Sequence, residues 1–132
     1  MASNEDGSLK KPVVLVVEDE SIIRMETVQM IKVVGYVVLD ACDTNDAMAI
    51  LEARHDVCAV FTEIRVPGHL DGMGLARAIA ERWPLVRLML TSSVSKVDDF
   101  PADWHYVPKP YASAQIVAAL RALFAPRLAV VN

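Results

Sequence analysis

Cysteine is scarce in this chain, whose 132 residues include only Cys42 and Cys58. The two cysteines show no Cys-x-x-Cys spacing and offer no disulfide framework. Because each lies in or beside an apolar, strand-like segment, we expect both to be buried structural thiols. The three histidines, His55, His69 and His105, have no metal-ligand spacing, so we expect them to lie on the surface or in loops.

Long apolar runs and clustered positive charge are also absent. No apolar stretch approaches the roughly 18 residues needed to span a bilayer, and the N-terminus lacks the basic-then-apolar pattern of a signal peptide. The 13 lysines and arginines are scattered, and the net charge is −4. This charge balance argues against a nucleic-acid surface. We therefore expect a cytoplasmic protein that has neither nucleic acid nor a membrane as a partner.

The chain does show a regular alternation of two patterns. Short apolar runs typical of buried parallel strands alternate with segments whose apolar residues recur at helical spacing. Strands are predicted at residues 13–17, 36–41, 57–62, 86–90 and 104–107. Helices are predicted at residues 21–34, 72–82 and 111–124, and a further helix is predicted after a cap at Asp43 or Thr44. Asp71 is the predicted cap of the helix at 72–82. This alternation predicts an α/β fold with a parallel sheet and right-handed crossovers. We also expect the methionines of the first helix, Met25 and Met30, to lie in the core.

The ends of the chain and one connection differ from this pattern. Residues 1–11 are polar, so we expect a disordered lead before a single domain at residues 12–125. Residues 126–132 form a short tail. Between the last two predicted strands, the segment 94–103 is short and is interrupted by Pro101. That segment leaves little room for a full helix.

Chemically active side chains follow the ends of the predicted strands. Glu18 and Asp19 follow the first strand, Glu63 ends the third, Thr91 follows the fourth and Lys109 follows the fifth. Ligands bind at this edge of open α/β sheets. Three carboxylates brought together there would repel one another, and Mg²⁺ would relieve the repulsion. A lysine and a hydroxyl beside them suit a phosphoryl group.

Each of these residues also has a purely structural interpretation. Glu18 and Asp19 could simply favour the positive end of the first helix. Glu63 could cap the following loop, Thr91 could be a turn residue, and Lys109 could be an ordinary surface lysine. Their coincidence at successive strand ends favours a functional site.

Four segments in fixed order resemble the motifs of the response-regulator receiver domain of two-component signalling. They are residues 14–20 with the acidic pair, 62–68 with the Pro-Gly loop, 90–92 with the threonine, and Tyr-Val-Pro-Lys-Pro at 106–110. The resemblance covers about residues 12–125. It implies a flavodoxin-like (βα)5 doubly wound parallel sheet with strand order 2-1-3-4-5, here with a shortened fourth helix.

The resemblance also implies a metal site. Asp19 would bind Mg²⁺ directly, and Glu18 would act largely through water. Glu63 occupies the phosphoacceptor position and would complete the site together with the main-chain carbonyl oxygen of Arg65. Mg²⁺ is therefore the expected cofactor.

The remaining implied roles concern the phosphoryl group and the switch between states. Thr91 and Lys109 would contact the phosphoryl group. Tyr106 would be the aromatic residue whose inward or outward position reports the state. The peptide bond between Lys109 and Pro110 would be cis, which X-Pro bonds tolerate.

Glu63 departs from the family pattern, in which the phosphoacceptor is aspartate. The extra methylene displaces the carboxylate, and about 1 Å of misplacement is costly for in-line attack. Normal phosphorylation is therefore not expected. Glu63 is either a natural atypical residue or an introduced phosphoryl mimic, and either could hold an active-like state or an inert one.

These observations predict a single-domain response regulator that acts in phosphorelay signalling through protein–protein interaction. A sensor histidine kinase or a histidine phosphotransfer protein would lie upstream and an output protein of unknown identity downstream. The chain would be a monomer or a weak homodimer. Two alternatives stay open: a small Mg-dependent phosphoryl-transfer enzyme, and a non-switching scaffold with a vestigial pocket. The absence of a Gly-x-Gly-x-x-Gly or Walker loop and of a Gly-x-Ser-x-Gly elbow gives the enzyme no further support.

Overall fold

Five parallel strands form one sheet in the computed structural model, which describes residues 11–93 and 101–125. The strand order is β2-β1-β3-β4-β5. The strands are β1 (Val13–Val17), β2 (Val37–Ala41), β3 (Val57–Glu63), β4 (Arg87–Ser92) and β5 (His105–Pro108). The predicted flavodoxin-like α/β fold with strand order 2-1-3-4-5 is confirmed.

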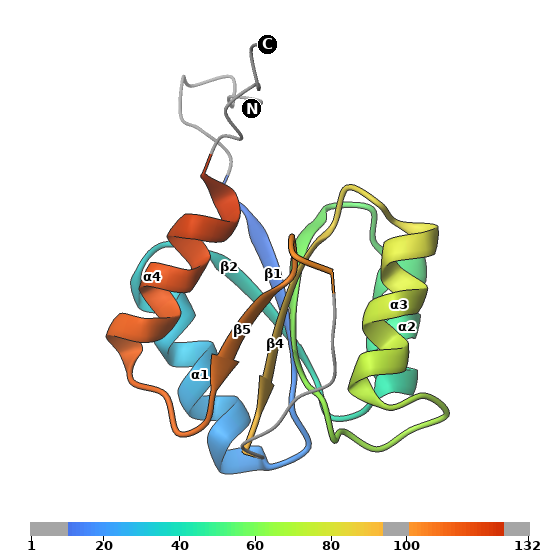
Figure 1. Cartoon of the computed structure of the whole chain (residues 1–132), viewed down its shortest axis with the longest axis horizontal. Coiled ribbons are helices and arrows are strands. Elements are labelled where there is room, and N and C mark those ends of the chain that lie inside the picture. Colours follow the sequence, from blue (N-terminus) through green and yellow to red (C-terminus); the bar gives the residue numbers. More distant parts are fainter. Residues whose placement is uncertain (1–10, 94–100, 126–132) are drawn as a thin grey trace, which may run out of the picture.

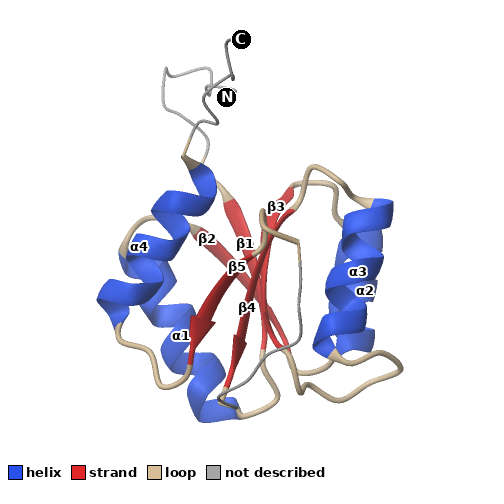
Figure 2. Cartoon of the chain, viewed as in Figure 1, coloured by secondary structure: helices blue, strands red, loops and turns tan. Residues whose placement is uncertain are grey.

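Four helices in the described residues cover the two faces of the sheet (Figure 1). They are α1 (Ser21–Val33), α2 (Thr44–Ala53), α3 (Gly72–Arg82) and α4 (Ser113–Phe124). Helices α1 and α4 lie on one face, and α2 and α3 lie on the other (Figure 2). The predicted lead at residues 1–11 and the tail at 126–132 lie outside the described residues, except for Lys11. The expected short segment at residues 94–103 also falls outside them, except for residues 101–103.

The core consists of two apolar layers that share the strands of the sheet. All five residues of β1 are buried, because this central strand is covered on both faces. Leu15 and its alternate neighbours pack in the layer that also holds Leu75 of α3. Val14 and Val16 pack in the opposite layer with Phe61 and other residues. The continuous apolar run that predicted a central strand therefore reflects burial on two sides.

Local sequence signals set the starts of two helices. The side chain of Asp43 accepts a hydrogen bond of 2.7 Å from the main-chain nitrogen of Asp46 and caps α2. Asp71 caps α3 in the same way through Gly74, also at 2.7 Å. A side-chain acceptor at this position satisfies an otherwise unpaired helix N–H group. Both caps agree with the sequence prediction.

The predicted start of the last helix is wrong by two residues. Helix α4 begins at Ser113, not at Tyr111, because the backbone of Ala112 is extended. The main-chain nitrogen of Ala112 donates a hydrogen bond of 2.7 Å to the Gln115 side chain, which fixes the helix start there. Tyr111 therefore belongs to the connection between β5 and α4.

Two predictions of burial are wrong. Helix α1 buries only a narrow stripe, Thr27 and Ile31, and Met25 is 61% exposed. The apolar residues of α1 therefore extend around more of the helix than the part that contacts the sheet. Cys42 is exposed and Cys58 is only partly buried. Cys42 lies beyond the end of β2, where the chain has already left the sheet.

Among residues 11–93 and 101–125, no helix combines the length and the apolar character required to cross a lipid bilayer.

Candidate functional site

The register of the strands brings the predicted site residues to one edge of the sheet. Glu63 is the last residue of β3 and pairs in register with Thr91 of β4. Thr62 pairs with Val17, the last residue of β1. Glu18 follows Val17 and is therefore a near neighbour of the end of β3. Three side chains named from the sequence thus lie at the carboxyl ends of three adjacent strands.

Lys109 lies between the two glutamates. Its ammonium nitrogen is 2.5 Å from Oε1 of Glu18 and 2.8 Å from Oε2 of Glu63. Both glutamates are buried, with side chains 3% and 6% exposed, and the Lys109 side chain is 14% exposed. Burial alone would lower the pKa of Lys109, but its bonds with Glu18 and Glu63 outweigh this effect and raise it. Lys109 is therefore a permanent cation in this site.

The burial of Glu18 disfavours its charged form. Burial raises the pKa of Glu18, and the hydrogen bonds from Lys109 and from the main-chain nitrogen of Glu20 offset this only in part. The Glu20 nitrogen lies 3.2 Å from Oε2 of Glu18. Both carboxylate oxygens of Glu18 therefore have partners, one ionic and one from the main chain.

Glu63 is held at both of its oxygens. Oε1 accepts a hydrogen bond of 3.3 Å from the main-chain nitrogen of Arg65, and Oε2 forms the ion pair with Lys109. The hydroxyl of Thr91, the register partner of Glu63, is buried and has no hydrogen-bond partner among the residues that the structure describes. An unpaired buried hydroxyl costs about 1–3 kcal/mol. Thr91 is therefore a donor that a ligand oxygen would satisfy.

The other predicted site residues lie around this centre. Asp19 and the side chain of Arg65 are exposed. Tyr106 is partly buried, and its hydroxyl donates a hydrogen bond of 3.4 Å to the main-chain oxygen of Ser92. Burial and the nearby charge of Glu63 raise the pKa of Tyr106. The Lys109–Pro110 peptide bond is cis, as the resemblance implies.

Comparison with known proteins agrees with this geometry. Residues 14–121 match the family model of the response regulator receiver domain. The chain belongs to the response-regulator receiver family. This family is a signalling module of two-component systems and not a conventional enzyme.

Solved receiver structures share the fold of this receiver domain. A response regulator receiver protein from Sinorhizobium medicae WSM419 is 24% identical, with a TM-score of 0.80 over 88% of this chain and 96% of that chain. The signal receiver domain of an HD domain-containing protein from Pseudomonas fluorescens Pf-5 is 22% identical, with a TM-score of 0.79 and coverages of 86% and 94%. The chemotaxis response regulator CheY4 of Vibrio cholerae is 16% identical, with a TM-score of 0.78 and coverages of 87% and 100%.

The donors of this receiver domain suit Mg²⁺, which receiver domains generally bind at their acidic pocket. Carboxylate and carbonyl oxygens are the ligands that Mg²⁺ prefers, and Glu18, Asp19, Glu63 and the Arg65 carbonyl offer them. The unpaired hydroxyl of Thr91 lies at the same edge. The three carboxylates, however, do not bring their oxygens within 4.8 Å of one another. In this arrangement, Lys109 supplies the neutralising charge for two of them.

Arg24 is a residue of the site that the sequence analysis missed. Its Nη1 donates hydrogen bonds to the main-chain oxygens of Glu18, at 2.7 Å, and Asp19, at 3.4 Å. Its Nε pairs with Asp40 at the end of β2, at 3.1 Å. Arg24 therefore ties the acidic loop after β1 to the neighbouring strand. A basic residue one turn into the helix that follows an acidic pair was the available signal.

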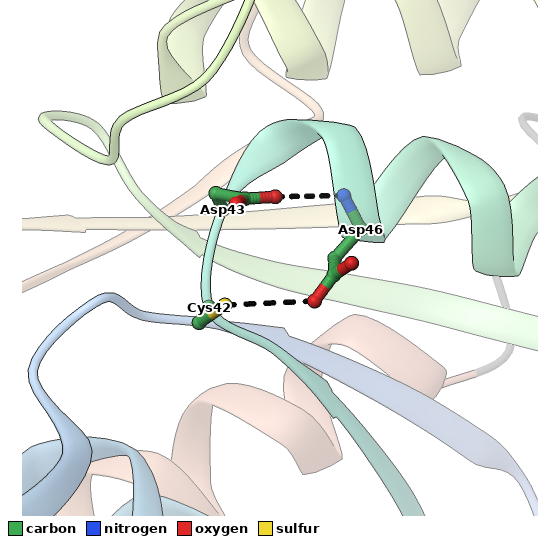
Figure 3. Close-up of side chains that lie close together, drawn as sticks. All are labelled: Cys42, Asp43 and Asp46. Atoms are coloured by element: carbon green, nitrogen blue, oxygen red, sulfur yellow. Dashed lines mark hydrogen bonds between the residues drawn. The ribbon is translucent and has the colours of Figure 1, made fainter.

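A second acidic group lies away from this centre. Cys42, Asp43 and Asp46 bring their ligand atoms within 4.8 Å of one another at the start of α2 (Figure 3). Their contacts have a structural explanation: Asp43 caps the helix, and the Cys42 thiol donates to Asp46 at 3.5 Å. The hydrogen bond to Asp46 raises the pKa of Cys42, which keeps the thiol protonated and a poor ligand.

Proposed function

We propose that this receiver domain takes part in phosphorelay signalling through protein–protein contacts, while Glu63 does not accept a phosphoryl group. The observation that carries the proposal is the place of Glu63. It ends β3 beside the unpaired hydroxyl of Thr91 and forms an ion pair with Lys109. The residue types that would contact a phosphoryl group therefore surround a glutamate.

Two features oppose attack by Glu63 on a phosphodonor. Its side chain is one methylene longer than that of aspartate, and displacing a nucleophile by about 1 Å can cost two orders of magnitude in rate. Both carboxylate oxygens are also engaged, one by Arg65 nitrogen and one by Lys109. The carboxylate would have to leave these partners before it could attack.

Glu63 instead resembles part of a phosphorylated side chain. Its carboxylate carries its negative charge beyond the reach of an aspartate and holds Lys109 at 2.8 Å. The resemblance is incomplete, because a phosphoryl group has nearly two charges and three acceptor oxygens. We therefore propose a partly active state, in which Thr91 still lacks the oxygen that would pair with its hydroxyl.

The partners proposed for this domain are proteins of the same signalling class. A sensor histidine kinase or a histidine phosphotransfer protein would bind upstream, and an output protein would read the state of Thr91 and Tyr106. Mg²⁺ is the proposed cofactor, held by Asp19, Glu18, Glu63 and the Arg65 carbonyl. When bound, Mg²⁺ would supply positive charge near a phosphoryl group.

Replacing Glu63 with aspartate tests this function. Glu63→Asp shortens the side chain and should allow labelling by acetyl phosphate in the presence of Mg²⁺, detected as a mass increase of the intact protein. The parent should remain unlabelled. Glu52→Asp makes the same change at an exposed site on α2 and should also remain unlabelled.

Two results would contradict the proposal. Acyl phosphate on Glu63 of the parent would show that glutamate accepts the group after all. A folded Glu63→Asp protein that binds Mg²⁺ but takes no label would show that the pocket has lost this chemistry at other residues.

A further inference from the structure

A pair of hydroxyl groups joins α1 to the connection that carries Lys109. The side-chain oxygen of Thr27 lies 2.6 Å from the hydroxyl oxygen of Tyr111, 84 residues further along the chain. Thr27 is 1% exposed, which makes it one of only two buried residues of α1. A valine and a phenylalanine would fill a similar volume without placing two hydroxyls in a partly buried site. The pair therefore fixes α1 relative to the connection after β5, in addition to filling space.

Tyr111 also contacts the strand that ends at Glu63. Its ring centroid lies 5.7 Å from that of Phe61, with the rings tilted by 55°. Phe61 is two residues before Glu63, and Tyr111 is two residues after Lys109. The tyrosine thus links both partners of the Lys109–Glu63 ion pair to α1, through its ring on one side and its hydroxyl on the other.

The space beside this connection is not fully packed. A cavity of about 170 Å³ lies between α1 and the connection. Its lining includes Glu26, Met30, Lys109, Pro110 and the Thr27–Tyr111 pair. Because side chains do not fill this space, the connection has no packed neighbour on that side. The Thr27–Tyr111 hydrogen bond at the wall of this space supplies a directional restraint.

We propose that the Thr27–Tyr111 pair is a positioning device that holds Lys109 between Glu18 and Glu63. Lysine has a flexible four-carbon side chain, so its ammonium group reaches two buried carboxylates at once only from a well-placed main chain. Without the hydroxyl pair, the connection moves toward the cavity, and Lys109 loses one of its two carboxylates. Through this pair, the position of α1 affects the Lys109–Glu63 ion pair. The importance of this effect for signalling rests on the proposed function.

The ¹H–¹⁵N signal of the Lys109 ammonium group tests this directly. Such a signal is visible when the group is largely buried and held in ion pairs on both sides, and Lys109→Arg identifies it by its loss. Thr27→Val and Tyr111→Phe each remove one hydroxyl and should broaden the signal beyond detection. Thr27→Ser retains a hydroxyl and should preserve it. Tyr36→Phe is the matched control, because Tyr36 stacks on Phe124 at the other end of α4, and it should leave the signal unchanged.

Several outcomes would overturn the proposal. They are a parent without a Lys109 signal, a signal that persists in both Thr27→Val and Tyr111→Phe, and a Thr27→Ser variant that behaves like Thr27→Val. If Thr27→Val does not fold, the more conservative Tyr111→Phe decides alone. The experiment uses no phosphodonor, so a failure of Glu63→Asp to take label would count against the proposed function and leave this inference standing.

Discussion

At the scale of single residues, the site depends on one lysine that neutralises two buried carboxylates. Lys109 contacts Glu18 and Glu63 at an edge where a third carboxylate, Asp19, remains exposed to solvent. Removing one partner of a buried ion pair leaves an uncompensated charge, which costs more than the pair itself contributes. The stability of this receiver domain should therefore be sensitive to Lys109.

Lys109→Met keeps most of the side-chain volume and removes the charge. We expect it to lower the free energy of unfolding by about 3–5 kcal/mol, the usual cost of breaking a buried pair, as measured by urea denaturation at pH 7. Arg82→Met is the matched control, because Arg82 pairs with Glu52 at the surface, where the side chains are 48% and 54% exposed. Its cost should stay below about 1 kcal/mol. Equal costs for the two variants would contradict the central role of Lys109.

The sequence placed most candidate residues at strand ends but did not reveal that one lysine contacts both buried glutamates. Glu18, Glu63 and Thr91 follow recognisable strands, so their edge of the sheet could be predicted. That Lys109 would contact two glutamates depends on the path of the connection after β5, which no local pattern encodes. The burial of Cys42 was predicted wrongly for a similar reason: its apolar neighbours belong to a strand that ends just before it.

At the scale of elements, the start of α3 lies directly against the end of β3. A Cβ atom on Gly72 would lie 1.9 Å from the main-chain oxygen of Glu63. The neighbouring atom is main chain and has no flexible side chain to turn away. Glycine at the first position of α3 therefore allows the helix to start directly against the residue at the phosphoacceptor position.

Gly72→Ala should force these two elements apart. We expect a loss of about 1–3 kcal/mol, the range for inserting a methyl group into a packed region, and changed amide shifts at Glu63. Gly74→Ala makes the same change two residues later, where the new Cβ would lie 3.2 Å from the Asp71 side chain. Its effect should be smaller, because alanine also favours the helix. Denaturation curves in which Gly74→Ala is the less stable variant would contradict this account.

Tyr111→Phe tests the link between α1 and the β5–α4 connection through pH. At pH 7, we expect a loss of about 1–2 kcal/mol, because the Thr27 hydroxyl keeps its burial and loses its partner. Burial is the largest cause that raises the pKa of Tyr111. Above about pH 10 the unfolded tyrosine releases its proton first, so the folded parent binds more protons and loses stability as the pH rises. The gap between parent and Tyr111→Phe should therefore narrow above pH 10, and a constant or widening gap in urea denaturation would contradict it.

At this scale, the sequence could not predict which residues of a helix face the sheet. The caps Asp43 and Asp71 were predictable because capping is a local interaction. The exposure of Met25 was not, because α1 contacts the sheet through a stripe narrower than its apolar spacing. Tyr111 was wrongly predicted to lie in the last helix. Its position is set by contacts with Thr27 and Phe61, which join segments far apart in the chain and leave no local sequence signal.

At the scale of the whole molecule, the fold could be predicted almost completely. Alternating strands and helices require a parallel sheet, and a central strand such as β1, apolar throughout, requires layers on both faces. The strand order 2-1-3-4-5 was predicted from the resemblance to receiver motifs, not from composition. The order is also what concentrates negative charge, because it places the ends of β1 and β3 side by side.

This concentration of charge links Mg²⁺ binding to the stability of the whole domain. A ligand that binds only the folded state stabilises it by mass action. At a MgCl₂ concentration about 100 times the dissociation constant, we expect the free energy of unfolding to rise by about 3 kcal/mol. A lower affinity gives a smaller rise in melting temperature. Sodium chloride at matched ionic strength should not reproduce the rise.

Three variants decide where the ion acts. Asp19→Asn should reduce the rise in melting temperature, whereas Asp46→Asn, the same change in the second acidic group (Figure 3), should not. Lys109→Met should enlarge it, because Mg²⁺ then no longer competes with an ammonium group for Glu18 and Glu63. If the rise depends on Asp46 instead, the ion binds at the start of α2. If Mg²⁺ stabilises neither the parent nor Lys109→Met, the glutamates of this pocket do not serve as metal ligands even when the lysine is removed.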